Sequence, residues 1–115
     1  MQDFIRQRFS RPTIPEIDAS QLSRVAQTHR VIDVRSSFEL DGPLGSIPEA
    51  ENVSLEVLAH AAQAWDRSEP LVLVCRSGAR SGHATLMLQQ MGFENVLNLR
   101  GGMIAYNSLA KRNAA

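Results

Sequence analysis

The stretch LVLVCRSGARSGH, residues 71–83, decides the fold of this chain. Its first four residues are apolar without polar alternation, which is typical of a central parallel strand covered on both faces. The only cysteine of the chain, Cys75, follows directly, and arginine, serine and glycine residues come after it. The pattern predicts a buried strand, a polar loop at its carboxyl end and a helix after the loop.

Strand-like and helix-like segments alternate on both sides of this stretch. Asp18 with Gln21, and later Ser54, are typical helix N-caps, and Gly92 is a typical helix end. We expect strands at 30–34, 51–53 and 94–99, and one helical turn at 36–40. We expect helices at 54–65, 81–91 and 103–111, and one that follows Asp18 and has Leu22, Val25 and Ala26 on its apolar face. This alternation indicates a small three-layer α/β domain in which helices flank a central parallel sheet.

Length and composition suit a single domain. The chain has 115 residues, of which 43% are hydrophobic, so we expect an N-terminal arm at 1–14 and one domain at 15–115. One cysteine excludes an internal disulfide and a cysteine-rich zinc site, and we expect neither a metal nor a cofactor. The start lacks the apolar core of a signal peptide and no segment could span a bilayer, so we expect a cytoplasmic protein without membrane contact.

The net charge is zero, but the charges are unevenly distributed. Residues 1–15 carry +2, residues 16–69 carry −6, and residues 70–115 carry +4, with five bases against Glu94. The basic excess lies in the part that contains Cys75, and no basic run is interleaved with aromatic residues. This distribution favours a small anionic substrate over a nucleic acid.

Cys75 stands where open parallel sheets bind ligands, beyond the carboxyl end of a strand and before a helix. If the loop curls around the sulfur, its backbone N–H groups and the helix N-terminus stabilise a thiolate. Gly78 permits the positive φ of such a turn, and Arg76 and Arg80 add positive charge. Settings of this kind lower a cysteine pKa from about 8.5 to roughly 3.5–7.5, which makes Cys75 a candidate nucleophile.

The segment CRSGARS resembles the active-site loop of rhodanese-like sulfurtransferases, which is Cys-x-x-Gly-x-Arg-Ser. VIDVRSSFEL is similar to the family's strand that ends in Asp-x-Arg, GSIPEAENVSL to its Gly-His-Ile-Pro-Gly-Ala-x-Asn stretch, and MGFENVLNLRGGMIAY to its Gly-Phe to Gly-Gly segment. Ser46 and Glu49 depart from the second motif. Cys75, Gly78, Arg80 and Ser81 match the loop motif, and Asp33 and Arg35 match the strand motif. We therefore expect Cys75 to be the nucleophile, and expect the substrate to be bound by the whole loop (Arg76, Ser77, Gly78, Ala79, Arg80 and Ser81) together with Asp33 and Arg35.

The resemblance implies a rhodanese-like fold and a ping-pong reaction. Cys75 would take sulfane sulfur from a small anionic donor and pass it to an external acceptor, which is cyanide or a thiol, including a thiol protein. The absence of a second cysteine means that no thiol of this chain can resolve the persulfide. Mercaptopyruvate-type loops of the family carry small neutral residues where Arg76 and Arg80 stand, so we expect thiosulfate or another anionic sulfane donor.

Several residues also have plain structural interpretations. Cys75 alone would more often be a small buried apolar residue. For Arg80 we favour a structural role, in which it ties the loop to neighbouring acids or carbonyls, over direct substrate contact. Asp33 and Arg35 are equally consistent with an ion pair that orders the strand ends and with a catalytic pair. His83 lies two residues beyond the ring and is expected to face away from it.

Two other functions stay open. The first is a rhodanese-related phosphatase or arsenate reductase, whose loops place five residues between cysteine and arginine, whereas four separate Cys75 and Arg80. Val74 also stands where a phosphatase of this type would have histidine. The second is a binding or regulatory module without turnover, and the retained Cys75 weighs against it.

Overall fold

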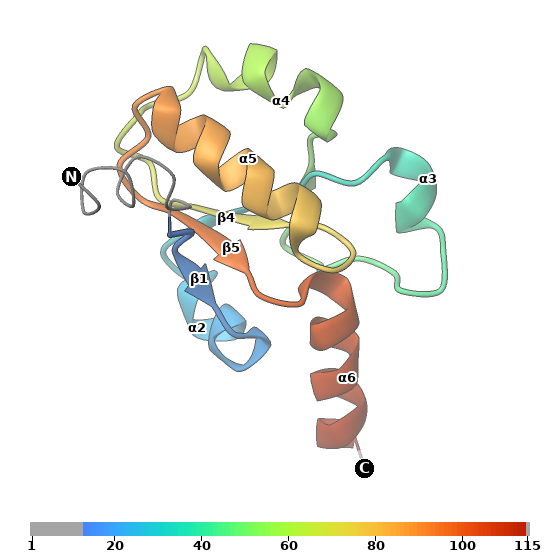
Figure 1. The fold of residues 1–115 in the computed structure, drawn as a ribbon. Coiled ribbons are helices and arrows are strands. Elements are labelled where there is room, and N and C mark those ends of the chain that lie inside the picture. The colour runs from blue at the N-terminus through green and yellow to red at the C-terminus, as the bar shows by residue number, and fades with distance from the viewer. Residues whose placement is uncertain (1–12, 115) are drawn as a thin grey trace, which may run out of the picture.

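A computed structural model describes residues 13–114 of the chain (Figure 1). Most of the expected arm at 1–14 lies outside the described residues. The elements in chain order are β1 (Glu16–Ile17), the 3-10 turn η1 (Ala19–Gln21), α2 (Leu22–Val25), β2 (Arg30–Asp33), α3 (Ser37–Leu40), β3 (Glu51–Asn52), α4 (Leu55–Ala62), β4 (Leu71–Val74), α5 (Ala79–Gln90), β5 (Val96–Leu99) and α6 (Gly102–Ala114). The five strands are parallel and lie in the order β1-β5-β4-β2-β3.

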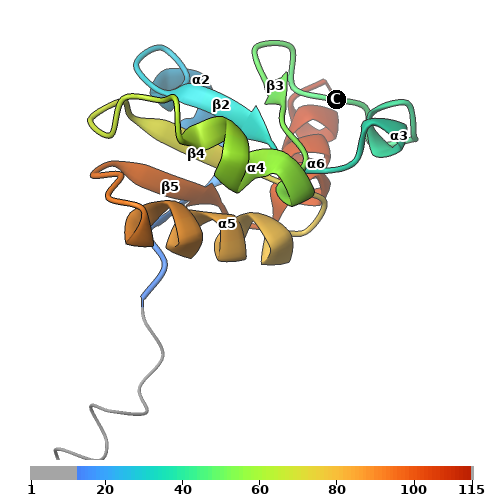
Figure 2. The same ribbon diagram turned by 90° about the horizontal axis from the view of Figure 1, so that it is seen from above.

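The sheet is the middle layer of three, as expected. Figure 2 shows α4 and α5 on one side of it and α2 and α6 on the other. Alternate residues of β4 supply both cores: Leu71 and Leu73 pack toward α4 and α5, and Val72 and Val74 toward α2 and α6. All four are fully buried, because β4 is central and covered on both faces. The apolar run before Cys75 is therefore the central strand of the sheet.

The structure differs from the sequence expectation at several elements; α6, for example, ends at Ala114 and not at Lys111. β1 was not expected, because two residues are too few for a pattern, and it forms by pairing with β5. α5 begins at Ala79 rather than Ser81, since Gly78 is the N-cap. α4 ends at Ala62, three residues before Trp65, after the expected N-cap Ser54.

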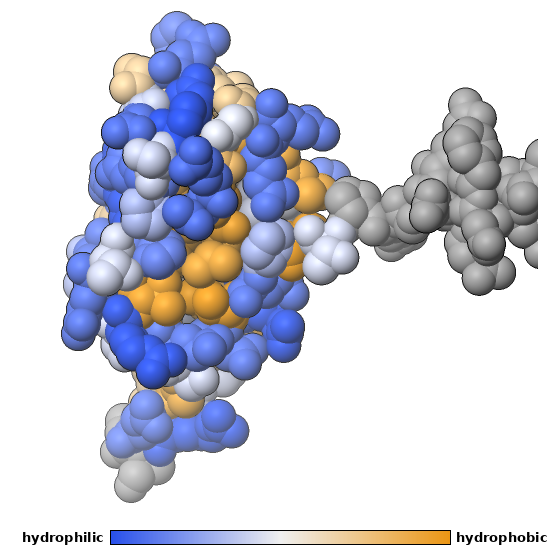
Figure 3. Space-filling model, turned by 90° about the vertical axis from the view of Figure 1, so that its left-hand side faces the viewer, coloured by the Kyte–Doolittle hydropathy of each residue, from blue (hydrophilic) through white to orange (hydrophobic). Residues whose placement is uncertain are grey.

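One face of the molecule, at the start of β4, carries an exposed apolar area. Figure 3 shows the face that lies to the left in Figure 1, where an apolar area is ringed by hydrophilic residues. β4 runs away from this face, so the loop that begins at Cys75 lies at the opposite end of the sheet. Within residues 13–114, no helix is both long and apolar enough to cross a membrane.

Candidate active site

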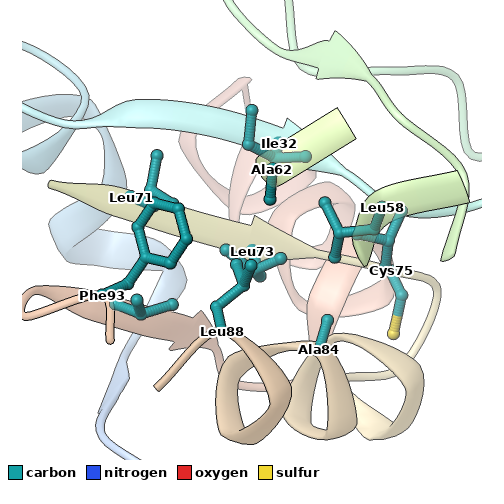
Figure 4. Close-up of a cluster of buried hydrophobic side chains, with 11 residues drawn as sticks. Ile32, Leu58, Ala62, Leu71, Leu73, Cys75, Ala84, Leu88 and Phe93 are labelled. Atoms are coloured by element: carbon teal, nitrogen blue, oxygen red, sulfur yellow. The ribbon is translucent and has the colours of Figure 1, made fainter. Parts of the chain in front are cut away.

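The loop between β4 and α5 closes around the sulfur of Cys75. The side chain is only 1% exposed and belongs to the core cluster, where Figure 4 shows it beside Leu58 and Ala84. The backbone N–H of Gly78 donates to Sγ over 3.1 Å, and the Ser81 hydroxyl lies 3.3 Å from the same atom. Gly78 can turn its amide inward because its φ is +101°, a conformation that side chains resist.

This setting lowers the pKa of Cys75 below that of an ordinary thiol. Burial acts in the opposite direction and raises the pKa, but hydrogen bonds to the sulfur from the Ser81 hydroxyl and from the amides of Ser81, Gly78 and Ser77 outweigh it. The pKa of the Arg80 guanidinium is raised mainly by its hydrogen bonds to Glu39, and the negative charge of the Cys75 thiolate adds to this effect. The side chain is thus both a buried core residue and an activated thiol.

The N-terminus of α6 supports the loop from behind. The amide of Met103 donates to the carbonyl of Cys75 over 2.8 Å, and the amide of Ile104 donates to the carbonyl of Arg76 over 3.1 Å. A Cβ at Gly102 would lie 2.4 Å from the Cys75 carbonyl oxygen, so only glycine allows this approach. These two hydrogen bonds fix the backbone of the first two loop residues against the start of α6.

Ser81 and Asn98 form a buried polar pair behind the sulfur. Asn98 lies in β5 among apolar residues, and its Oδ1 is 2.5 Å from the Ser81 hydroxyl. Its Nδ2 donates to the Glu16 carboxylate over 2.9 Å and to the Gly78 carbonyl over 3.1 Å. Sequence reasoning did not identify Asn98 as a site residue, although one amide in the apolar strand VLNL was a usable signal.

Arg80 ties the loop to α3, which is the role that its sequence context favoured. Its two terminal nitrogens donate to the two carboxylate oxygens of Glu39 over 2.8 and 2.7 Å. Glu39 also accepts a hydrogen bond from the backbone N–H of Ser36 and so caps α3. The hydrogen bonds from Arg80, against the effect of burial, lower the Glu39 pKa to about 2. Much of the Arg80 charge is therefore neutralised by a carboxylate of the same chain, in a partly exposed pair.

Asp33 and Arg35 form a buried ion pair at the end of β2. Each side chain is 1% exposed, and Arg35 Nη2 donates to Asp33 Oδ2 over 2.7 Å and to the Gly45 carbonyl over 2.8 Å. Asn52 donates to the backbone carbonyls of both residues. Of the two interpretations left open by the sequence, this geometry favours the ordering ion pair.

The outer side of the loop is exposed at Arg76, Ser77 and Ala79. Arg76 forms no ion pair with any residue between 13 and 114. Together with Arg35 it lines a pocket of about 120 Å³ beside the loop. His83 is exposed between the buried residues Gly82 and Ala84, so it faces away from the sulfur, as expected.

Comparisons with known proteins agree with this geometry. The family model of the rhodanese-like domain matches residues 18–109. A sulfurtransferase of Allochromatium vinosum is 38% identical over 96 residues, which cover 81% of this chain and 88% of that protein. The thiosulfate sulfurtransferase GlpE of Shewanella oneidensis is 34% identical over 82 residues, which cover 71% and 79% of the two chains.

Solved structures share the fold as well. The crystal structure of a rhodanese-related protein from Thermoplasma volcanium has a TM-score of 0.74 and 28% sequence identity, and the match covers 83% of this chain and 92% of that one. The family match includes the strand before Cys75, the loop around its sulfur and the glycine at the start of α6. On these grounds, the chain belongs to the rhodanese-like domain family.

Proposed function

We propose that this protein is a sulfurtransferase that carries sulfane sulfur on Cys75, with thiosulfate as its preferred kind of donor. The observation that supports this most is the sulfur of Cys75, which receives hydrogen bonds from Gly78 and Ser81 in a loop that lowers its pKa. The sulfurtransferase names of similar proteins point the same way.

The proposed reaction has two steps, and each transfers one sulfur atom. First, the Cys75 thiolate attacks the outer sulfur of thiosulfate, the S–S bond of the donor breaks, and sulfite leaves with the electron pair. Cys75 then carries a persulfide. Second, cyanide or a thiolate attacks the outer sulfur, and Cys75 leaves as a thiolate. Hydrogen bonds from the loop stabilise that leaving thiolate and so favour the second step.

The choice of donor rests on Arg76. Thiosulfate carries two negative charges, and Arg76 is exposed at the loop without a carboxylate partner among residues 13–114. Arg80 contributes less to the donor site than its charge alone suggests, because Glu39 neutralises it. Mercaptopyruvate has one negative charge when its thiol is protonated, so it gains less from Arg76.

The loop also bears on the alternative of phosphoryl transfer. The amide of Gly78 and the hydroxyl of Ser81 approach the sulfur itself at 3.1 and 3.3 Å. A ring with four residues between Cys75 and Arg80 suits a single sulfur atom better than a tetrahedral oxyanion. Phosphatase activity is the result that would favour the alternative.

Intact mass spectrometry tests the proposal. After incubation with thiosulfate, the protein should gain the mass of one sulfur atom, and a thiol or cyanide wash should remove it. Cys75→Ser should gain nothing and transfer no sulfur while keeping its unfolding midpoint. Sulfur transfer by this variant would contradict the proposed role of Cys75. Faster loading from mercaptopyruvate than from thiosulfate would contradict the proposed choice of donor.

A further inference from the structure

The Ser81 hydroxyl has one proton and two acceptors within reach. Its oxygen lies 3.3 Å from Cys75 Sγ and 2.5 Å from Asn98 Oδ1. Ser81 and Asn98 are 0% and 1% exposed, so neither has ready access to bulk water. Because a hydroxyl donates one hydrogen bond, the sulfur and the amide oxygen compete for it.

The orientation of the Asn98 amide is fixed by its other contacts. Its nitrogen faces two acceptors, the Glu16 carboxylate at 2.9 Å and the Gly78 carbonyl at 3.1 Å. An oxygen in that place would be repelled by both, so the carbonyl of the amide must face Ser81. Asn98 therefore presents an acceptor, and never a donor, to the Ser81 hydroxyl.

We propose that Asn98 is a positioning residue of Cys75: it holds the Ser81 hydroxyl proton away from the sulfur and so limits how readily the thiolate forms. This inference rests on the proposed function only for its role in catalysis. In the thiol form, the S–H donates to Ser81 and Ser81 donates to Asn98, so both acceptors are satisfied. When the thiol proton leaves to solvent, the hydroxyl must turn from Asn98 to stabilise the negative sulfur.

This competition has a use in sulfur transfer. A thiolate that is stabilised too strongly is a weaker nucleophile, since intrinsic nucleophilicity falls with pKa. Once Cys75 carries the persulfide, its Sγ has less negative charge than the free thiolate. The Ser81 hydroxyl can then donate to Asn98 again. Asn98 would thus keep Cys75 reactive toward the donor, and Ser81 would stabilise it as a leaving group.

Other charges face this site from several elements, and the test must leave them unchanged. They are Arg76 and Arg80 of the loop and α5, Glu39 of α3, Asp33 of β2, Glu16 of β1, and Arg100 after β5. The α4 side of the sulfur is apolar. Asn98→Leu removes the acceptor, adds no charge and keeps a similar volume. Gly78 then retains the Gly82 N–H on its carbonyl, and Glu16 retains Arg100.

The experiment measures the alkylation rate of Cys75 against pH in the full chain. Asn98→Leu should lower the apparent pKa by about 0.5 to 1, the value of one freed hydrogen bond. Its limiting rate at high pH should fall by about two- to threefold, because the better stabilised thiolate is less nucleophilic. Ser81→Ala should raise the pKa, and the double variant should match Ser81→Ala alone.

Thr85→Val is the matched control. Thr85 is buried on the same helix and donates to the Ser81 backbone carbonyl over 2.8 Å, so the substitution removes a buried hydrogen bond without touching the hydroxyl. The pKa of Cys75 in this variant should equal its pKa in the parent protein. If Asn98→Leu does not fold, Asn98→Ala decides, because it also removes the acceptor and adds no charge, so it should lower the pKa of Cys75.

Three results would overturn the inference. They are an unchanged or raised pKa of Cys75 in folded Asn98→Leu, the same result in Asn98→Ala, and an effect of Asn98→Leu that persists without the Ser81 hydroxyl. Alkylation needs no sulfur donor, so this outcome is independent of the persulfide measurement. A protein that shows the pKa shifts but never gains sulfur would contradict the proposed function and leave the role of Asn98 standing.

Discussion

Two neighbouring strand ends of this sheet carry an arginine at the same place with opposite consequences. β2 and β4 are paired so that Asp33 lies opposite Val74, and Arg35 and Arg76 each follow two residues later. Both arginines line the same pocket. Yet Arg35 is 1% exposed and paired with Asp33, whereas Arg76 is exposed and has no acidic partner within residues 13–114.

The difference lies in what the next segment does. After Arg35, the chain folds back as α3 and the loop that contains Gly45, and both accept hydrogen bonds from the guanidinium. After Arg76, the chain turns tightly around the sulfur into α5, and within residues 13–114 the arginine side chain stays exposed. An arginine that is paired with a carboxylate and backbone carbonyls of its own chain, such as Arg35, orders the structure. An exposed arginine without such a partner, such as Arg76, is available to a ligand. The β2 end therefore has its charges paired within the fold, and we propose that the β4 end is the one that meets the substrate.

The largest expected effect concerns stability. Arg35→Met leaves the Asp33 carboxylate buried without its partner, which should reduce the free energy of unfolding by about 3–5 kcal/mol. Arg76→Met should change it by no more than about 0.5 kcal/mol, as at other exposed sites. Urea denaturation measures both. The double variant Asp33→Asn, Arg35→Met should lose less than Arg35→Met alone, and equal losses for Arg35→Met and Arg76→Met would erase the contrast.

The next effect concerns the rate of sulfur transfer. Arg76→Ala should lower kcat/KM for thiosulfate by roughly ten- to hundredfold, the value of one charge-assisted contact of about 1.5–3 kcal/mol made in the transition state. If Arg76 acts mainly by steering the anion, the loss should shrink as the salt concentration rises. Steady-state kinetics at low and high salt measure this. Full thiosulfate activity of the variant at low salt would show that the exposed arginine is not used.

The smallest effect concerns the link between the two strand ends. Glu39→Gln weakens the contact from α3 to Arg80, a partly exposed pair, so the loss of stability should stay within about 1 kcal/mol. The Glu39 pKa is about 2 in the folded protein, below its ordinary value of 4.5. Its contribution is therefore complete above about pH 4.5 and is lost as the pH falls toward 2.

Urea denaturation between pH 2 and 7 measures this contribution. The parent protein and Glu39→Gln should differ most near neutral pH and converge at low pH. A difference that grew on acidification would mean that Glu39 is protonated in the folded protein. Glu39→Gln should also raise thiosulfate activity slightly, because it frees the charge of Arg80.

The sequence was most informative where a pattern was local. The four apolar residues before Cys75 predicted β4 and its central place, because a strand buried on both faces has no polar alternation. The sequence C-R-S-G-A-R-S predicted the ring around the sulfur, because a glycine and a helix start were placed at the required spacing. Such features depend on a few consecutive residues.

Features that depend on distant pairing were missed or left open. β1 has only two residues and exists because β5 offers its edge. Asn98 lies 23 positions after Cys75 and reaches the site only through the parallel pairing of β4 with β5. The choice between a catalytic and an ordering role for Asp33 and Arg35 depended on burial, which α3 and the Gly45 loop provide.

From local patterns alone, the sequence predicted the fold class, the strand before Cys75 and the residue types around its sulfur, and it made Cys75 the candidate nucleophile. Which arginine charges are neutralised by carboxylates of the same chain depends on the tertiary structure. Arg35, Arg76 and Arg80 look alike along the chain, and they differ because Asp33 and Glu39 reach two of them and no described residue reaches the third. Electrostatic interactions act through space, and only the folded chain sets those distances.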